Sequence, residues 1–195
     1  GTFLACSSSS PGQSLFGCRM KKKLEIGCGE RPTPGYIHND INAFPDVELV
    51  CNPWEIDLDS ESLDEALALG VVEHLTYEQV EMTVTNVQRM LRRGGCFYFD
   101  VPDLPAWCCY AADYFKGRPT PFPIEHILST LYGWQRWPGD EHKSGWYEEN
   151  LVQMLERTGF CSVKFGVEIF RKHGIERNRM NNPADAHLYC VAVKD

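Results

Sequence analysis

Two glycines and two carboxylates near the start of the chain have the types and spacing of a cofactor-binding turn. Residues 25–29 read EIGCG after a short apolar run, and Asp40 ends the next apolar run. Glycines let the backbone turn sharply beside a ligand, and a carboxylate can accept hydrogen bonds from the two hydroxyls of a ribose. A dinucleotide site would continue as GxGxxG into a helix, but Pro32, Pro34 and Gly35 occupy that stretch. The pattern therefore predicts a cofactor without a pyrophosphate.

Other candidate binding residues follow the third and fourth predicted strands. Asn52 offers an amide to an adenine edge, and Trp54 offers an indole for stacking or packing. Gly70 and Val71 follow the fourth strand, where a small residue gives a ligand close access. We expect these residues to lie at the carboxyl edge of the sheet, where ligands collect in open parallel sheets.

Two histidines and one aspartate are candidates for proton transfer. His142, in GDEHKSGW, is the first candidate for a general base, and His74 is the second. Asp103 would orient a histidine or act as the base itself. The competing structural interpretations are that His74 packs beneath a ligand and that His142 braces a loop.

The elements that position these residues alternate between strands and helices. Thr76 and Gln79 form a capping box that starts a helix, and Gly94-Gly95 is expected to end it. The order predicts an α/β, Rossmann-like, mostly parallel sheet with an antiparallel C-terminal strand and reduced N-terminal helices. The predicted strands are 24–26, 36–41, 47–51, 64–69, 96–101, 162–170 and 187–193, with a second helix at 147–157.

Composition limits the classes of partner. The chain has 195 residues and a formal net charge of −8, so we expect neither nucleic acid nor a membrane as partner. Nine cysteines are scattered without a CxxC pair or regular Cys/His ligand spacing. This predicts buried thiols in a reducing cytoplasm and no metal site.

The chain is expected to form one domain after a short leader. Residues 1–19 contain a serine run and no periodicity, and Met20 has the features of a natural start. We therefore predict that 1–19 is a leader or added segment without fixed structure and that 20–195 is a single domain. Residues 104–146 are rich in aromatics, which either cover a bound substrate or pack over the sheet.

Four motifs together resemble one enzyme family. LEIGCG, GYIHNDI, SLDEALALGVVEHL and MLRRGGCFYFDVPD are similar, in order and spacing, to the class I S-adenosylmethionine-dependent methyltransferases, in a compact subgroup with a shortened first helix. The resemblance covers about residues 22–103 and implies S-adenosylmethionine as cofactor. It departs at Asn52, where relatives have aspartate, and at Pro53, which has no N–H. The implied roles are Glu25, Gly27, Cys28 and Gly29 for the methionine end, Asp40 and Ile41 for the ribose, Asn52 and Trp54 for the adenine, and Gly70 and Val71 for the other flank.

The resemblance implies methyl transfer to an oxygen or nitrogen of a small molecule. A sugar, an envelope precursor or a secondary metabolite of a bacterial-type pathway fits the acidic, aromatic-rich sequence. The alternatives are a non-catalytic binding or regulatory protein of the same fold, and an NAD-linked oxidoreductase, which Pro32 disfavours. A shortened first helix would uncover apolar sheet surface, which either the segment after Asp103 or the second copy in a homodimer would cover.

Overall fold

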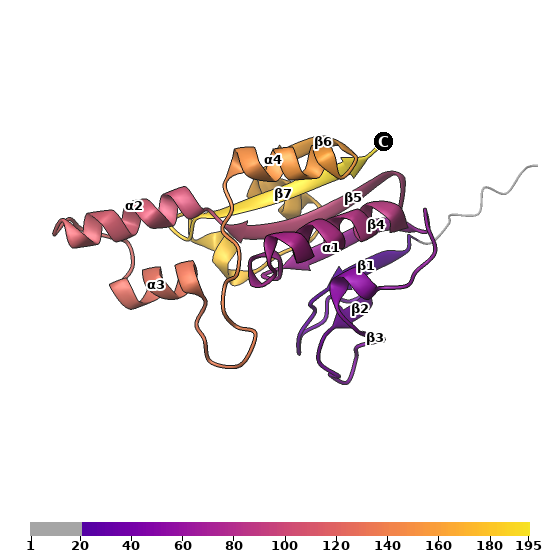
Figure 1. Cartoon of the computed structure of the whole chain (residues 1–195), viewed down its shortest axis with the longest axis horizontal. Helices are drawn as coiled ribbons and strands as arrows, with labels where there is room; N and C mark the ends of the chain where they lie inside the picture. The colour runs from indigo at the N-terminus through magenta and orange to yellow at the C-terminus, as the bar shows by residue number, and fades with distance from the viewer. Residues whose placement is uncertain (1–20) are drawn as a thin grey trace, which may run out of the picture.

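One seven-stranded sheet forms the centre of the molecule (Figure 1). The computed structural model describes residues 21–195, so the predicted leader lies outside the described residues. The strand order is β3-β2-β1-β4-β5-β7-β6, and only β7 runs antiparallel to its neighbours among the described strands. The predicted α/β, mostly parallel sheet is thus confirmed. The strands are β1 (Lys23–Ile26), β2 (Ile37–Asp40), β3 (Leu49–Val50), β4 (Leu63–Leu69), β5 (Leu91–Pro102), β6 (Phe160–Phe165) and β7 (His187–Lys194).

Helices α1 and α4 cover one face of the sheet. The predicted capping box starts α1, because Thr76 Oγ1 accepts from the Gln79 backbone N–H at 3.2 Å. Val80, Val84 and Val87 of α1 are buried against the sheet in the larger hydrophobic core. The helices are α1 (Tyr77–Met90), α2 (Leu104–Phe115), α3 (Ile124–Tyr132), α4 (Glu148–Arg157) and α5 (Val167–Lys172), with 3-10 turns η1 (Pro53–Glu55), η2 (Val72–His74) and η3 (Asn178–Asn181).

Among residues 21–195, the second face carries α5 and the segment that contains η3. No α-helix lies between β1 and β2 or between β2 and β3. This confirms the prediction that the N-terminal helices are reduced. Phe170, Ile175 and Met180 pack on Tyr98 and Tyr189 and form a smaller core on this face. The C-terminal segment therefore covers part of this face, where the sequence predicts the segment after Asp103 or a second copy.

The part of that face over β1 and β4 carries polar side chains, which corrects the expected apolar surface. The Tyr36 hydroxyl donates to the Glu65 carboxylate, which also lies 3.2 Å from the Lys23 ammonium. Burial and this hydrogen bond raise the pKa of the Tyr36 hydroxyl above its usual value of 10.0. Because these side chains satisfy one another, the strands need no apolar helix above them.

The predicted ends of the first helix and of strand 162–170 are wrong, and the predicted strand 96–101 begins earlier, at Leu91. Helix α1 ends at Met90 rather than at Gly94-Gly95, because Leu91 is already extended and pairs with Leu63 of β4. The predicted strand 162–170 ends at Phe165, where Gly166 has a φ of +144° and starts α5. Apolar residues in 167–170 fit a strand or a buried helix equally well, so their pattern did not distinguish the two.

Helices α2 and α3 form a hairpin that extends from the sheet at the end of β5 (Figure 1). The sequence predicted the aromatic segment but neither helix. Trp107 and Ile127 are the fully buried apolar residues of these two helices. Among the helices of residues 21–195, none has the length and apolarity needed to cross a bilayer.

Candidate functional site

The turn after β1 is held by the carboxylate that ends β2. The backbone N–H of Gly29 donates to Asp40 Oδ2 at 3.0 Å, and the N–H of Asn42 donates to Asp40 Oδ1 at 2.8 Å. Gly27 and Gly29 have φ values of +65° and +60°, a region that other residues enter at a cost. A carboxylate has about four lone-pair positions, so Asp40 keeps acceptor capacity for a ligand hydroxyl.

The two glycines meet different surroundings. A Cβ built on Gly27 would lie 2.4 Å from Val71 Cγ2, so the turn after β4 packs directly on this residue. A Cβ on Gly29 would meet nothing within 4 Å. Space for a ligand therefore lies beside Gly29, while Val71 closes the turn at Gly27.

Glu25 is buried and already has partners. Its carboxylate accepts from the Thr33 backbone at 2.6 Å and from the Thr33 hydroxyl at 2.7 Å. Arg177, from the C-terminal segment, donates to Glu25 Oε1 at 3.2 Å. The sequence predicted Glu25 as a cofactor contact but did not predict Arg177, which lies in a polar segment without a recognisable motif.

Cys28 contributes a thiol that stays protonated near neutral pH. Burial, followed by the charges of Asp40 and Glu25, raises its pKa to about 11. Because the thiolate is the reactive form, this environment does not produce a nucleophile. The expectation of buried thiols holds for Cys28 and Cys190 and is wrong for the exposed Cys108, Cys109 and Cys161.

The predicted adenine contacts, Asn52 and Trp54, and the second predicted ribose contact, Ile41, make no hydrogen bond to this turn among the described residues. Asn52 Nδ2 donates to Glu55 Oε2 at 2.9 Å, so its amide caps η1. Trp54 lines a hollow of about 590 Å³ with side chains of α1, and Ile41 is 60% exposed.

A buried ion pair closes the ends of β4 and β5. Asp100 is fully buried, accepts from the Gly70 N–H at 2.9 Å and lies 2.5 Å from Arg179 Nη2. A Cβ on Gly70 would lie at ordinary contact distance, 3.4 Å, from Arg179 Nη1, so the φ of +68° rather than lack of space favours glycine here. Burial lowers the pKa of Arg179, but the charges of the Asp100 and Glu73 carboxylates together outweigh this effect. The net shift of the pKa is upward. Sequence reasoning missed both Asp100 and Arg179.

Glu73, His74 and His142 come together beside this pair. One donor atom from each side chain lies within 4.8 Å of those of the other two, and the two imidazoles meet edge to face with centroids 4.8 Å apart. The N–H groups of Lys143 and Ser144 donate to the Glu73 carbonyl at 2.8 and 3.2 Å. These bonds bring His142 to the turn after β4, so the two predicted histidines lie in one place.

The cluster's surroundings shift two of its pKa values. Burial, with the nearby Asp100 charge, raises the pKa of Glu73. Burial and the charge of His74 lower the pKa of His142 to about 4. His142 is therefore neutral at pH 7 and a weak base, since efficient general bases have pKa values near the working pH.

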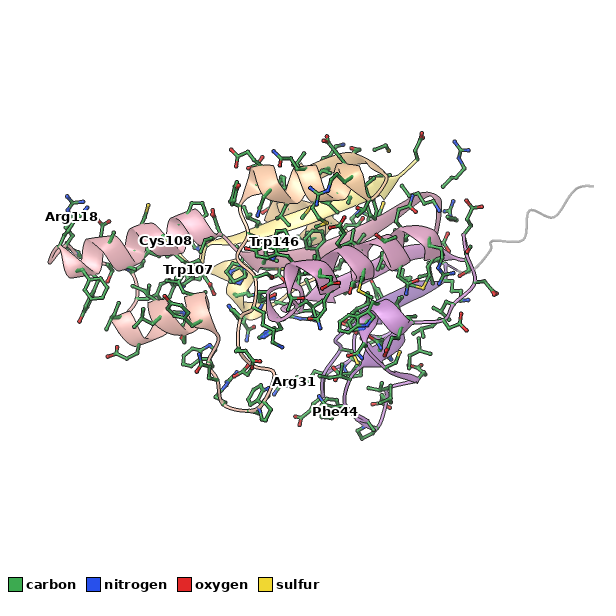
Figure 2. All side chains as sticks on the ribbon, viewed as in Figure 1. Arg31, Phe44, Trp107, Cys108, Arg118 and Trp146 are labelled. Carbon is green, nitrogen blue, oxygen red and sulfur yellow. The ribbon has the colours of Figure 1, made fainter. Side chains whose placement is uncertain are left out.

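Asp103, the third proton-transfer candidate, is not in this cluster. It forms a parallel bridge with Trp146, and Leu104 N–H donates to the Trp146 carbonyl at 3.0 Å. The hairpin between these residues is anchored by Trp107, whose Nε1–H donates to the Ala186 carbonyl at 2.7 Å. Figure 2 labels Trp107 and Trp146 where the hairpin joins the sheet. Several hairpin aromatics stay exposed, namely Tyr114, Phe115, Tyr132, Trp134 and Trp137.

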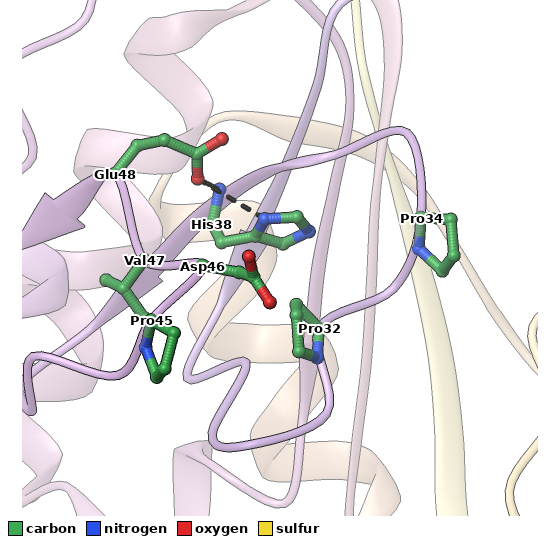
Figure 3. A pocket seen from close by; sticks show the side chains of 7 residues that line it. All are labelled: Pro32, Pro34, His38, Pro45, Asp46, Val47 and Glu48. Carbon is green, nitrogen blue, oxygen red and sulfur yellow. Dashed lines mark hydrogen bonds and ion pairs between the residues drawn. The ribbon is translucent and has the colours of Figure 1, made fainter.

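A second hollow lies between the proline-containing segment that follows the glycine turn and the loop between β2 and β3 (Figure 3). Its volume is about 530 Å³, and three prolines line it with Asp46 and with the His38–Glu48 ion pair, whose atoms are 3.2 Å apart. Among residues 21–195, neither of the two hollows described includes Gly27, Gly29 or Gly70 in its lining.

Comparisons with known proteins give a fold and no close relative. Neither models of protein families nor curated proteins match this sequence. A methyltransferase from Archaeoglobus fulgidus, described as S-adenosylmethionine-dependent, has a TM-score of 0.55 at 18% identity, with 89% of this chain and 86% of that one covered. The 1,6-didemethyltoxoflavin-N1-methyltransferase of Burkholderia thailandensis, solved with its substrate and S-adenosylhomocysteine, gives 0.53 at 14% identity, covering 91% and 72%.

A domain of a larger enzyme has the same architecture. The methyltransferase domain of the citrinin polyketide synthase gives a TM-score of 0.54 at 16% identity, and 89% of this chain covers 46% of that one. The described chain thus spans less than half of that structure. The strand order, the reversed β7 and these similarities lead to one conclusion: this chain has the class I S-adenosylmethionine-dependent methyltransferase fold.

Proposed function

We propose that this protein transfers a methyl group from S-adenosylmethionine to an oxygen or nitrogen of a small-molecule acceptor. The observation that carries the proposal is the bond from the Gly29 N–H to Asp40 Oδ2, which joins the turn after β1 to the carboxylate at the end of β2. This arrangement leaves room beside Gly29 and lone pairs on Asp40 for a ribose. A cofactor without phosphate also explains why the turn needs no helix after it.

The residues at the sheet edge fit the cofactor in part. Gly29 and Asp40 offer space and acceptors, and Val71 closes the turn from the side of β4. Glu25 would share its carboxylate between Arg177 and the ammonium of the methionine end. When bound, the cofactor supplies a methyl group on a positively charged sulfur.

The remaining task of the protein is to align the acceptor and exclude water. We assign the acceptor to the ends of β4 and β5, where His74 and His142 offer nitrogen lone pairs beside the buried Glu73. The α2–α3 hairpin starts at this end of β5 and is proposed to cover the acceptor with its aromatic side chains. Asp103 lies at its base and is less well placed as a base than the two histidines.

Calorimetric titration with S-adenosylmethionine, S-adenosylhomocysteine and NAD tests the cofactor. Asp40→Ala is expected to weaken binding of both sulfur compounds by about 10- to 100-fold, because a hydrogen bond to a charged group contributes roughly 1.5–3 kcal/mol. Asp57→Ala, at an exposed position after η1, is the matched control and should leave binding unchanged. Equal affinity in the Asp40→Ala variant, or a preference for NAD, would refute the assignment.

A non-catalytic protein of the same fold is the second candidate. Two observations favour it: Glu25 is held by Arg177 and Thr33, and the Asn52 amide is held by Glu55. Such a protein would bind S-adenosylmethionine but form no S-adenosylhomocysteine with any acceptor. A screen of hydroxyl- and amine-bearing metabolites, read out as S-adenosylhomocysteine formation, separates the two candidates.

A further inference from the structure

We propose that Glu73, His74 and His142 form a binding site for a divalent transition-metal ion of the Zn²⁺ class. One donor atom from each side chain lies within 4.8 Å of the other two. Two imidazoles and one carboxylate, with positions left open for a further ligand, are a donor set that suits Zn²⁺ and related ions. The sequence predicted no metal site, because two of these ligands are adjacent and the third lies far along the chain.

The fold fixes all three ligands to one piece of backbone. Glu73 and His74 belong to η2, directly after β4. The segment that carries His142 is bonded to η2 through Lys143 and Ser144, whose N–H groups donate to the Glu73 carbonyl. The Ser144 hydroxyl adds a bond to the Val72 carbonyl at 3.3 Å. The third ligand is therefore held to the same turn that supplies the first two.

Glu73 is the observation that points to a ligand. Glu73 is only 4% exposed, and its Oε2 atom has no hydrogen-bond partner among residues 21–195. Buried polar atoms in native proteins are almost always partnered, since burial removes the water that would otherwise bond to them. A metal ion at this position would provide the missing partner.

His74 is oriented as metal-ligating histidines usually are. Its Nδ1 lies 3.2 Å from the Glu141 carbonyl oxygen. A carbonyl only accepts hydrogen bonds, so Nδ1 carries the hydrogen and Nε2 keeps its lone pair. The backbone thus sets the tautomer that leaves one nitrogen free to bind an ion.

Neighbouring charge does not oppose a cation. Arg179 lies nearby, but the carboxylate of Asp100, 2.5 Å away, balances its positive charge. Glu73 is therefore an acidic group beyond the one that this arginine needs. Ligand atoms on an ion with bonds of about 2.0–2.2 Å are roughly 3.4 Å apart in tetrahedral geometry. The donor atoms would therefore approach one another by at most about 1.4 Å, which side-chain rotation can supply.

One consequence rests on the proposed function. An ion at the ends of β4 and β5 would bind an acceptor hydroxyl and lower its pKa, which replaces direct proton removal by a histidine. The acceptor class would then be a hydroxyl-bearing molecule rather than an amine. The metal site itself is tested without S-adenosylmethionine, so it can fail or hold independently of methyl transfer.

The test uses Zn²⁺ alone on the full chain. After chelator treatment and dialysis, exposed thiols are blocked with N-ethylmaleimide, because Cys108, Cys109 and Cys161 could also bind zinc. Titration calorimetry then measures stoichiometry and affinity for the native sequence, Glu73→Gln and His142→Asn. His173→Asn, on an exposed histidine whose ring contacts the Tyr98 hydroxyl, is the matched control.

The expected result is one strong site per chain that each ligand variant weakens by at least about 100-fold, since loss of a mere supporting residue already costs 10- to 100-fold. The control variant should bind as the native sequence does. X-ray absorption of the zinc-loaded protein should show nitrogen and oxygen neighbours, a readout that stands even if a variant does not fold. Sulfur neighbours, or equal affinity in folded Glu73→Gln and His142→Asn, would overturn the proposal.

Discussion

Removing Arg179 should destabilise the fold far more than removing an exposed arginine. Asp100 is fully buried, and its Oδ1 accepts the Gly70 N–H while Oδ2 faces Arg179 at 2.5 Å. Arg179→Met would leave this carboxylate buried without a counter-charge. Loss of one partner of a buried pair costs about 3–5 kcal/mol, and we expect the lower end because the Arg179 side chain is 28% exposed. About 3 kcal/mol corresponds to a fall in Tm of roughly 6–12 °C for a chain of this size.

Urea unfolding at pH 7 with linear extrapolation measures the change, and the slope m should stay constant. The control is Arg118→Met, which breaks an ion pair with Asp113 whose side chains are 62% and 37% exposed and which should cost less than about 1 kcal/mol. In a double-mutant cycle, adding Asp100→Asn to Arg179→Met should recover part of the loss. A loss from Arg179→Met no larger than from the control, or a double variant whose losses simply add, would refute the reasoning.

Three further predictions follow from individual residues. Gly29→Ala should lower the free energy of unfolding by about 1–2 kcal/mol, because of its positive φ alone. Gly27→Ala should lower it more, because the added Cβ would lie 2.4 Å from Val71 Cγ2. Equal losses in urea unfolding would contradict the close contact. Trp107→Ala should cost about 3–5 kcal/mol and speed proteolysis within 104–132, while amide protection in the sheet stays; loss of protection in both would show that the hairpin and sheet unfold together. Burial raises the pKa of the Cys28 thiol from 9.0 to about 11, so its contribution to stability is complete below pH 9 and is lost as the pH rises through 11. At pH 8, iodoacetamide should therefore label Cys28 more slowly than the exposed cysteines, as mass mapping would measure. Equal labelling would count against the raised pKa.

The sheet was predictable because its signals are local. The EIGCG turn, the short link to Asp40 and the Thr76 capping box each depend on neighbouring residues, and each appears where the sequence places it. The ends of α1 and β6 could not be predicted in this way. Leu91 pairs with a strand distant in the sequence, and residues 167–170 have an apolar pattern that fits either a strand or a helix.

The interactions that complete the candidate site depend on contacts across most of the chain. Arg177 meets Glu25, and Arg179 meets Asp100, from a C-terminal segment whose sequence reads only as polar and turn-prone. Likewise, His74 and His142 were singled out separately, but their contact depends on backbone bonds that no spacing rule expresses. Both cases are tertiary, and local pattern carries no information about them.

The bridge between Asp103 and Trp146 holds together the two ends of a long insertion in the fold. The chain leaves the sheet and returns to it at adjacent positions, because the two residues are paired side by side. Helices α2 and α3 can therefore change in length and surface while the strands keep their register, provided that Trp107 keeps its bond to the Ala186 carbonyl and Lys143 and Ser144 keep theirs to η2.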